Sequence, residues 1–249
     1  MVMFLLRFKL VNKLLLLYLV DRAQIHGGIF EDTRLQKLVF LSERIMLGKK
    51  LRGFTYEFIK LLHGPYSSEL DRDKAILGAA QLIDYSSEKG YYVSKKGSYV
   101  LELFKHVLEK NIQFVEIIDE IVRKYTRMSL EELLAWIYNL RRGIRGDEQR
   151  IGLLPMRTVI LAKPKGENYI DFKIGDNELW ELSFWMDPDV ETIEETSVKS
   201  YRVLLLKYKG DRYWSAVVPS LLGCVSQGED KKSAIANIGE AIEAYIGST

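Results

Sequence analysis

The chain has 249 residues, of which 47% are hydrophobic and 28% charged, a composition that excludes a disordered protein and suits one or two globular domains. The net charge of +2 predicts no partner, but residues 1–150 carry 25 basic and 19 acidic side chains (+6), and the remainder carries −4. The single cysteine excludes an internal disulfide and a cysteine-based zinc cage, and it suits a reducing cytoplasm.

The apolar N-terminal segment predicts a buried helix over residues 8–24. Its longest uninterrupted apolar run, Leu14 to Val20, has seven residues, whereas a membrane span needs about 20. No small-residue cleavage site follows this run, so a signal peptide is not expected. The sequence therefore predicts no membrane association.

The next elements predict a mostly helical domain over residues 1–142. They are a helix capped by Asp32 or Thr33 and ending at Gly48, a short strand or irregular segment at 54–62, a helix at 67–83, a hairpin turning at Glu88-Lys89-Gly90, a helix at 98–127, and a helix from a capping box at Ser129 to about Arg142. Three helices and a hairpin follow the order of a winged helix, in which 67–83 would be the recognition helix.

Residues 143–200 predict a connecting region. Two strands at 158–162 and 169–174, with a turn at Pro164, suggest a hairpin, and the acidic stretch 187–196 suggests a linker. Residues 201–249 predict a third part with strands at 201–208 and 213–218, a short strand at 225–228, and a helix at 231–246 capped by Asp230. The expected fold class is α+β.

The chemistry-bearing residues do not predict an enzyme. The strands at 201–208 and 213–218 contain no carboxylate that could hold a catalytic metal, and the three histidines lack metal-ligand spacing. Cys224 follows a glycine without a neighbouring base, and no phosphate-binding glycine loop is present. We expect no catalytic residue, no metal and no cofactor.

The C-terminal part resembles the HicB family of antitoxins. The residues that carry the resemblance are Ala216-x-x-Pro219, Gly223-Cys224, Ser226-x-Gly228, and a helix with Ala234, Asn237, Ala241 and Ile242. Asp230 and Ser233 stand where the family usually has Thr and Glu. The resemblance implies a βββα module with a partial RNase H-like fold, and as partner a small basic RNA-cleaving toxin of the HicA type.

The N-terminal part is similar to YwgA-like and Panacea-like proteins over about residues 10–142. The similarity is carried by Leu35-Gln-Lys-Leu-Val39, His63-Gly-Pro-Tyr-Ser-Ser-Glu-Leu70 and Ser129-Leu-Glu-Glu-Leu133. It implies a winged-helix-like fold, and Panacea-like domains are themselves associated with antitoxins. Both resemblances therefore imply a cytoplasmic regulator of the toxin–antitoxin type, which we expect to form a homo-oligomer.

Two sets of residues are candidates for binding. The candidate DNA contacts are Lys49, Lys50, Arg52, Ser67, Arg72, Lys89, Lys95 and Lys96. The candidate toxin contacts are Tyr213, Trp214, Leu221, Leu222, Glu229 and Asp230. The acids at the start of 67–83 would face DNA phosphates badly, so a protein-binding platform is an equal alternative for the first domain. A transcription regulator without a toxin, whose C-terminal module serves dimerisation, and a degenerate RNA-binding protein are the alternatives for the whole chain.

Overall fold

The computed structural model describes residues 2–142, 149–166 and 168–247, with side chains from Leu6 onward. The chain divides into two compact units, Met1–Lys173 and Ile174–Thr249. The first unit contains 29 basic and 21 acidic side chains and the second contains 7 and 13, so their formal charges are +8 and −6. The difference in net charge between the two sides is therefore larger when the chain is divided after Lys173 than when it is divided after residue 142 or residue 200, as the sequence suggested.

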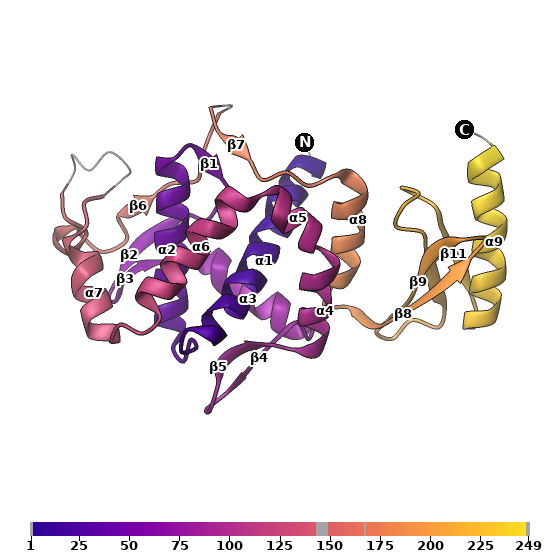
Figure 1. Cartoon of the computed structure of the whole chain (residues 1–249), viewed down its shortest axis with the longest axis horizontal. Coiled ribbons are helices and arrows are strands. Elements are labelled where there is room, and N and C mark those ends of the chain that lie inside the picture. Colours follow the sequence, from indigo (N-terminus) through magenta and orange to yellow (C-terminus); the bar gives the residue numbers. More distant parts are fainter. Residues whose placement is uncertain (1, 143–148, 167, 248–249) are drawn as a thin grey trace. The chain divides into compact units, whose positions relative to one another are not determined.

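The first unit is organised around three helices, α1 (Val2–Ile25), α2 (Asp32–Gly48) and α6 (Ile112–Tyr125) (Figure 1). The α1 side chains from Leu14 to Leu17 are fully buried, as the apolar spacing of this segment predicted. Within the described residues, no helix combines the length and the apolar character that crossing a membrane requires.

The predicted long helix over 98–127 is wrong, because the segment forms α4 (Lys95–Leu103), α5 (Lys105–Lys110) and α6. The last break lies at Asn111, whose side chain is buried and bonds to backbone outside the helices. Its amide nitrogen donates to the carbonyl of Lys173, and its oxygen accepts from the Lys173 N–H at 2.6 Å. A side chain that serves a distant backbone in this way favours a break over a continuous helix.

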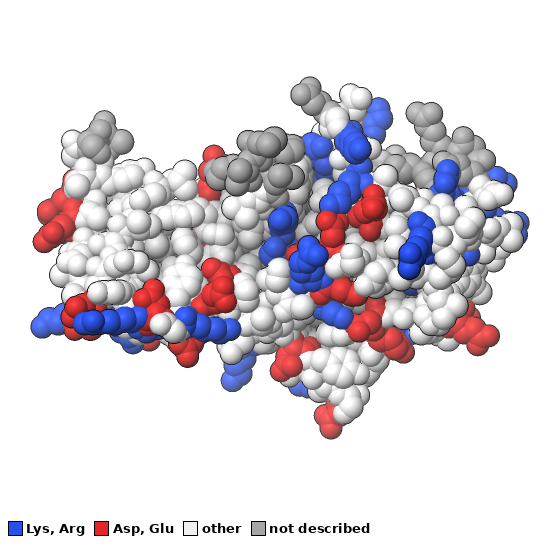
Figure 2. Space-filling model, turned by 180° about the vertical axis from the view of Figure 1, so that it is seen from behind, with Lys and Arg blue, Asp and Glu red and all other residues white. Residues whose placement is uncertain are grey.

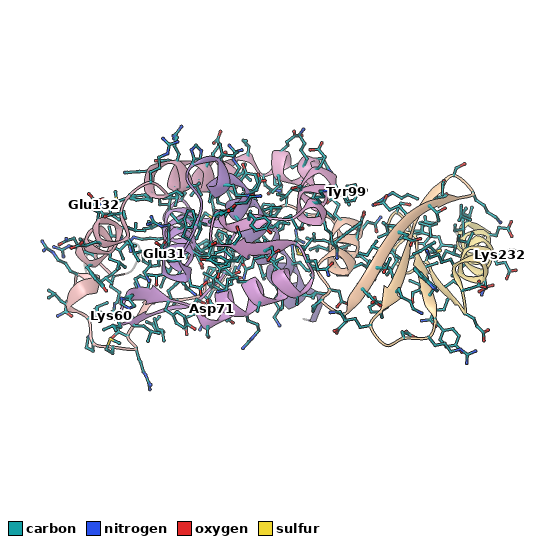
Figure 3. All side chains as sticks on the ribbon, turned by 90° about the horizontal axis from the view of Figure 1, so that it is seen from below. Glu31, Lys60, Asp71, Tyr99, Glu132 and Lys232 are labelled. Carbon is teal, nitrogen blue, oxygen red and sulfur yellow. The ribbon has the colours of Figure 1, made fainter. Side chains whose placement is uncertain are left out.

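The remaining helices of this unit are α3 (Ser68–Ala79), α7 (Leu130–Asn139) and the short η1 (Ile151–Leu153). The predicted capping box at the start of α7, where Figure 3 labels Glu132, is confirmed. Ser129 Oγ accepts from the Glu132 N–H, and the Glu132 carboxylate accepts from the Ser129 N–H.

Three small sheets complete the first unit. One pairs β1 (Leu51–Arg52) with β7 (Ile170–Asp171), the second has the order β3 (Gly64–Tyr66), β2 (Phe58–Leu61), β6 (Val159–Leu161), and the third is the hairpin of β4 (Ile83–Ser86) and β5 (Gly90–Val93). The hairpin around Lys89 is confirmed. The predicted pairing of 158–162 with 169–174 is wrong, because each segment pairs with an earlier strand instead.

The second unit contains α8 (Asp176–Trp185), the strands β8 (Val190–Val198), β9 (Tyr201–Tyr208), β10 (Trp214–Val217) and β11 (Val225–Gly228), and α9 (Lys231–Gly247). The strands form an antiparallel sheet in the order β11-β10-β9-β8. The acidic segment 187–196 was predicted as a linker, but most of it forms β8. Its alternating side chains fit a strand, so the module has four strands where three were expected.

One face of this sheet packs on α9. The core is made by Val203, Leu205, Ala216, Val218, Cys224, Ala234, Ile238 and Ile242, all buried. The three helix members have the spacing i, i+4, i+8 that the sequence predicted for the apolar face of α9. Both units therefore contain helices and strands, which agrees with the α+β class.

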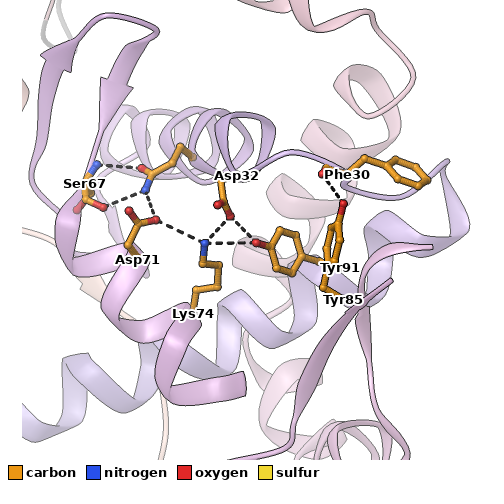
Figure 4. Close-up of polar contacts among 8 residues, drawn as sticks. Phe30, Asp32, Ser67, Asp71, Lys74, Tyr85 and Tyr91 are labelled. Carbon is orange, nitrogen blue, oxygen red and sulfur yellow. Dashed lines mark hydrogen bonds and ion pairs between the residues drawn. The ribbon is translucent and has the colours of Figure 1, made fainter. Parts of the chain in front are cut away.

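The motif at residues 35–39 in α2 and the motif at residues 63–70 before α3 contact each other. The Gln36 side chain donates to the Ser67 carbonyl and accepts from the Ser67 N–H at 2.9 Å, and Lys37 Nζ donates to the Pro65 carbonyl at 2.8 Å. The α2 motif therefore holds the Gly64-Pro65 turn and the start of α3 in place (Figure 4). This contact gives both motifs a structural role.

Lys37 predicts a pH dependence of stability. Only 2% of this residue is exposed, and burial lowers the pKa of its amine from 10.5 to about 7. Between these two values the unfolded chain binds more protons than the folded one, so the free energy of unfolding rises with pH, by up to about 1.4 kcal/mol per pH unit. We expect Lys37→Met to remove this slope. Urea unfolding of both proteins at pH 7 and pH 9.5 measures it, and parallel pH profiles would contradict the assignment.

Candidate partner-binding surfaces

A shallow hollow of about 520 Å³ surrounds the start of α9 in the second unit. Its lining consists of Tyr213, Gln227, Gly228, Glu229, Asp230, Ser233 and Asn237. The turns after β9 and β11 supply Tyr213, Glu229 and Asp230, strand β11 supplies Gln227 and Gly228, and α9 supplies the last two. Because the hollow is wide and open, it suits a protruding group of a protein partner better than an enclosed small molecule.

Asp230 caps α9, as the sequence predicted. Its Oδ1 accepts from the Ser233 N–H at 2.7 Å and from the Ser233 hydroxyl at 2.8 Å. These hydrogen bonds, with the backbone bond first, lower the pKa of the Asp230 carboxyl, so it stays ionised. Glu229 lies beside it, within 3.2 Å of exposed Arg212. The hollow therefore presents two carboxylates, one of which is partly compensated by a surface ion pair.

The six predicted toxin contacts do not form one surface. Tyr213, Glu229 and Asp230 line the hollow together. Trp214 and Leu221 instead pack against the core of the second unit. The Lys231 and Lys207 ammonium groups lie 4.7 and 5.7 Å from the centre of the Trp214 ring, which covers it further. Leu222 is 42% exposed but lies outside the hollow's lining.

The structure adds an acidic edge that the sequence interpretation missed. Strand β8 lies at one edge of the sheet and carries Glu191, Glu194 and Glu195. Lys231 pairs with Glu194 at 2.6 Å and Arg202 with Glu195 at 2.7 Å, whereas Glu191 is exposed. The β-branched residues of this segment, two Val, two Thr and one Ile among nine residues, were the signal of a strand. Charged side chains on an edge strand also oppose non-specific sheet pairing.

The hairpin of the first unit is fixed to the helices beside it. The Tyr91 N–H donates to the Ile29 carbonyl at 2.8 Å, and the Tyr91 hydroxyl donates to Asp32 at 2.5 Å. Lys74 of α3 pairs with the same Asp32, so the hairpin, α2 and α3 meet at one carboxylate (Figure 4). Asp32 therefore serves as an anchor, and its predicted role as helix cap is wrong, because Glu31 occupies the cap position.

The acids at the start of α3 are all engaged by partners within the first unit, although only Asp73 is buried. Glu69 accepts from Lys163 at 2.5 Å, Asp71 from Gln36 at 2.9 Å, and Asp73 from the buried Tyr56 hydroxyl at 2.9 Å. The exposed residues of the helix are Ser68, Arg72, Ala75, Gly78 and Ala79. The acids therefore do not dominate the outer face of α3, which removes the main objection that the sequence raised to DNA binding.

The predicted DNA contacts fall into separate groups. Lys89 and Lys95 are exposed on and beside the hairpin, and Lys96 next to them donates to the Ala80 carbonyl at 2.9 Å. Lys49 and Lys50 follow the opposite end of α2. Its 17 residues separate them from the hairpin by about 25 Å, at 1.5 Å per residue. These two lysines do not share a surface with the hairpin, contrary to expectation.

Two members of the predicted DNA-binding set are buried and unsuited to contact phosphates. Arg52 is 8% exposed and bonds to both carboxylate oxygens of Asp171, at 2.5 and 2.8 Å. Ser67 is 2% exposed, as the residue before α3. Arg72 is exposed on α3. On the face drawn in Figure 2, basic and acidic side chains are interspersed. Of the predicted DNA contacts, Arg72, Lys89 and Lys95 therefore remain exposed and suited to contact phosphates.

Short stretches of the chain are similar to known proteins. The chain is 50% identical over 48 residues to a UPF0150 protein of Thermoplasma acidophilum, covering 19% of this chain and 68% of the relative. It is 46% identical over 57 residues to a UPF0150 protein of Synechocystis, covering 23% and 71%. The chain belongs to the UPF0150 family.

A UPF0150 protein of Helicobacter pylori is 51% identical over 39 residues, which cover 16% of this chain and 54% of the relative. No family model matches the chain, and no solved structure matches it. The UPF0150 relatives are thus small proteins composed largely of the shared stretch, whereas most of this chain lies outside it. Within the described residues, no cluster of three or more His, Cys, Asp or Glu side chains is placed to hold a metal ion.

Proposed function

We propose that this UPF0150 protein is a non-catalytic regulator whose second unit binds and neutralises a small basic toxin. The observation that carries the proposal is the charge of −6 on the second unit beside +8 on the first. The acidic edge of β8 and the carboxylates of the hollow belong to this acidic unit. Complementary charge speeds association with a basic partner and discriminates against acidic ones.

The length of the UPF0150 matches fits the resemblance to HicB antitoxins. The matched stretches of 48 and 57 residues are close in length to residues 201–249, where that resemblance lies, and we infer that they correspond to this part of the chain. The resemblance implies a HicA-type ribonuclease as the toxin. A non-catalytic role is supported by β9, β10 and β11, which carry no carboxylate, and by the ion pairs of Glu194 and Glu195 on β8.

A tagged full-length chain purified from its native host, with and without nuclease, tests the proposal. We expect a stoichiometric small basic protein that remains bound after nuclease treatment. Its RNA cleavage should be blocked when the regulator is present in equal amount. Recovery of duplex DNA alone would overturn the proposal and favour a transcription regulator whose second unit serves assembly. Enrichment of RNA without a protein would favour an RNA-binding protein.

Charge reversal in the hollow predicts a specific loss of partner binding. We expect Glu229→Lys to weaken the complex about tenfold and more at low salt, because it places a cation against a basic partner. Glu240→Lys is the matched control, since Glu240 is exposed on α9 outside the hollow's lining and changes the net charge equally. Titration calorimetry of both variants measures the difference. Equal weakening by both would assign the effect to net charge rather than to the hollow.

Because each acid at the start of α3 is engaged by a partner within the first unit, DNA binding is a second candidate activity of this unit. Each lysine that contacts a phosphate contributes about 0.9 to the slope of log K against log salt. We expect Lys89→Ala and Lys95→Ala each to reduce this slope by about one and to weaken binding equally for all duplex sequences. Lys105→Ala, an exposed lysine of α5, should leave the slope unchanged. Fluorescence anisotropy across a salt series measures it, and three equal slopes would exclude the hairpin as the DNA surface.

A further inference from the structure

A cavity of about 290 Å³ lies within the first unit, between α1, α3 and the residues that follow β1 and β6. The described residues that line it include five cations and two carboxylates, together with Asn12, Thr55, Tyr56, Phe8, Ile76 and Pro164. Neither the DNA surface nor the hollow at α9 uses this cavity, although Arg72 stands at its edge. Its size lies at the lower limit of small-molecule sites, about 300–1,000 Å³.

Asn12 presents an unused donor in this cavity. The residue is 5% exposed, and its Oδ1 accepts from the Thr55 N–H at 3.0 Å and from the Thr55 hydroxyl at 3.3 Å. Because a backbone N–H must meet an oxygen, this contact fixes which side of the amide is which. The amide NH2 group then has no hydrogen-bond partner within the described part of the chain. This nitrogen is not sealed from solvent, since the fully buried side-chain atoms without a partner in the described residues belong to Glu43, Ser67 and Thr126. It lines the cavity and can therefore donate to a ligand that enters it.

A buried ion pair lies beside it. Lys13 Nζ is 3.7 Å from Asp73, which also accepts from the Tyr56 hydroxyl at 2.9 Å. Burial lowers the pKa of Lys13 and raises that of Asp73, so both groups are displaced toward their neutral forms. A bound anion next to Lys13 would favour its charged form and recover part of this cost.

The charges around the cavity do not cancel. Lys13 is paired with Asp73, Lys163 with Glu69, and Arg52 with Asp171. Lys9 on α1 and Arg72 on α3, both exposed, have no acidic partner among the described residues. Two uncompensated cations remain, one on each of two facing helices. Such an arrangement matches a ligand with two negative charges rather than one.

We propose that this cavity binds a small phosphomonoester, such as a sugar phosphate. A phosphomonoester carries about −1.5 to −2 charges at neutral pH and offers three acceptor oxygens. Lys9 and Arg72 neutralise the phosphoryl group, and the Asn12 amide donates to the ligand inside the cavity. The volume accommodates a sugar phosphate but excludes a dinucleotide. The ligand would join α1 to α3, and this proposal does not depend on the toxin-binding function.

Thermal shift and titration calorimetry of the full-length chain test the cavity. The probes are ribose 5-phosphate and glucose 6-phosphate, with the free sugars and inorganic phosphate as controls. We expect the sugar phosphates to raise the Tm and the free sugars to have no effect. Arg72→Gln and Lys9→Gln, which change exposed side chains, should each weaken binding about tenfold. Asn12→Asp keeps the acceptor for Thr55 but places a carboxylate where the donor was, and it should abolish binding.

Lys105→Gln serves as the control for removal of a positive charge, and it should bind as the unaltered chain does. The cavity proposal is overturned if neither sugar phosphate binds at millimolar concentration. Equal binding of the free sugars, or binding that survives both Arg72→Gln and Asn12→Asp, would overturn it as well. If Asn12→Asp does not fold, the two exposed-residue variants still decide the question.

Discussion

Replacing Arg34 by methionine is expected to destabilise the first unit by about 3 to 5 kcal/mol. Arg34 is 7% exposed, and its Nη1 donates to the carbonyls of Tyr125, Thr126 and Met128, at 3.3, 3.1 and 2.7 Å. These carbonyls end α6 or follow it, where a helix has no partners of its own and where its dipole favours a cation. Methionine fills the space but leaves them unsatisfied, at about 1–3 kcal/mol for each buried group.

Thermal unfolding measures this effect, with a Tm at least about 6 °C lower for a unit of this size. Arg34→Lys should be intermediate, because an ammonium can donate to these carbonyls but lacks the Nε–H that Arg34 donates to Glu31 at 3.1 Å. Arg127→Met is the control, since Arg127 is an exposed arginine whose single contact to the His26 carbonyl is 3.4 Å long. If Arg34→Met were as mild as Arg127→Met, the bonds from Arg34 would not contribute to stability.

Replacing Gly90 by alanine is expected to cost about 2 to 5 kcal/mol and to release the hairpin from α2. A β-carbon at this position would lie 2.3 Å from the Ile29 carbonyl oxygen, and the residue has a φ of +68°. The left-handed backbone costs a residue with a side chain about 1–2 kcal/mol, and the overlap adds about 1–3 kcal/mol. Since the Ile29 carbonyl is backbone, the relief comes from moving the hairpin.

Hydrogen exchange at the Tyr91 amide reports this release directly, because that N–H donates to the Ile29 carbonyl. We expect its protection to fall in Gly90→Ala, while amides in the middle of α1 change less. Gly166→Ala is the matched control, with a φ of +86° and open space around the new carbon. Gly166→Ala should lower the free energy of unfolding only by the cost of the left-handed backbone conformation. Equal losses in the two variants would show that the contact with Ile29 does not hold the hairpin.

Local patterns predicted the elements whose stability depends on near neighbours in sequence. The apolar spacing identified α1 and the buried face of α9, and the cap residues identified the starts of α7 and α9. The Glu88-Lys89-Gly90 turn identified the hairpin of β4 and β5. Each of these signals acts within a few residues, so a single sequence carries it.

Pairing between distant segments could not be predicted in this way. The strand β6 pairs with β2 and β7 with β1, about 100 residues earlier in the chain, and a local hairpin was the nearest alternative. The acidic segment 187–196 was interpreted as a linker, because its high charge outweighed the strand preference of its β-branched residues. The predicted long helix is broken at Phe104 and Asn111, and at Asn111 the side chain bonds to Lys173, which lies 62 residues away.

The sequence by itself determined the class of the fold, the main helices, the hairpin and the charge contrast between the two parts, because composition and short-range pattern carry them. Only the tertiary structure decided which charges are exposed. Arg52 is buried and paired with Asp171, and the acids of α3 are engaged by partners within the first unit, whereas Glu229 and Asp230 meet Tyr213 at one hollow. A charged side chain is available to a partner when folding leaves it exposed, and residues far away in sequence decide that.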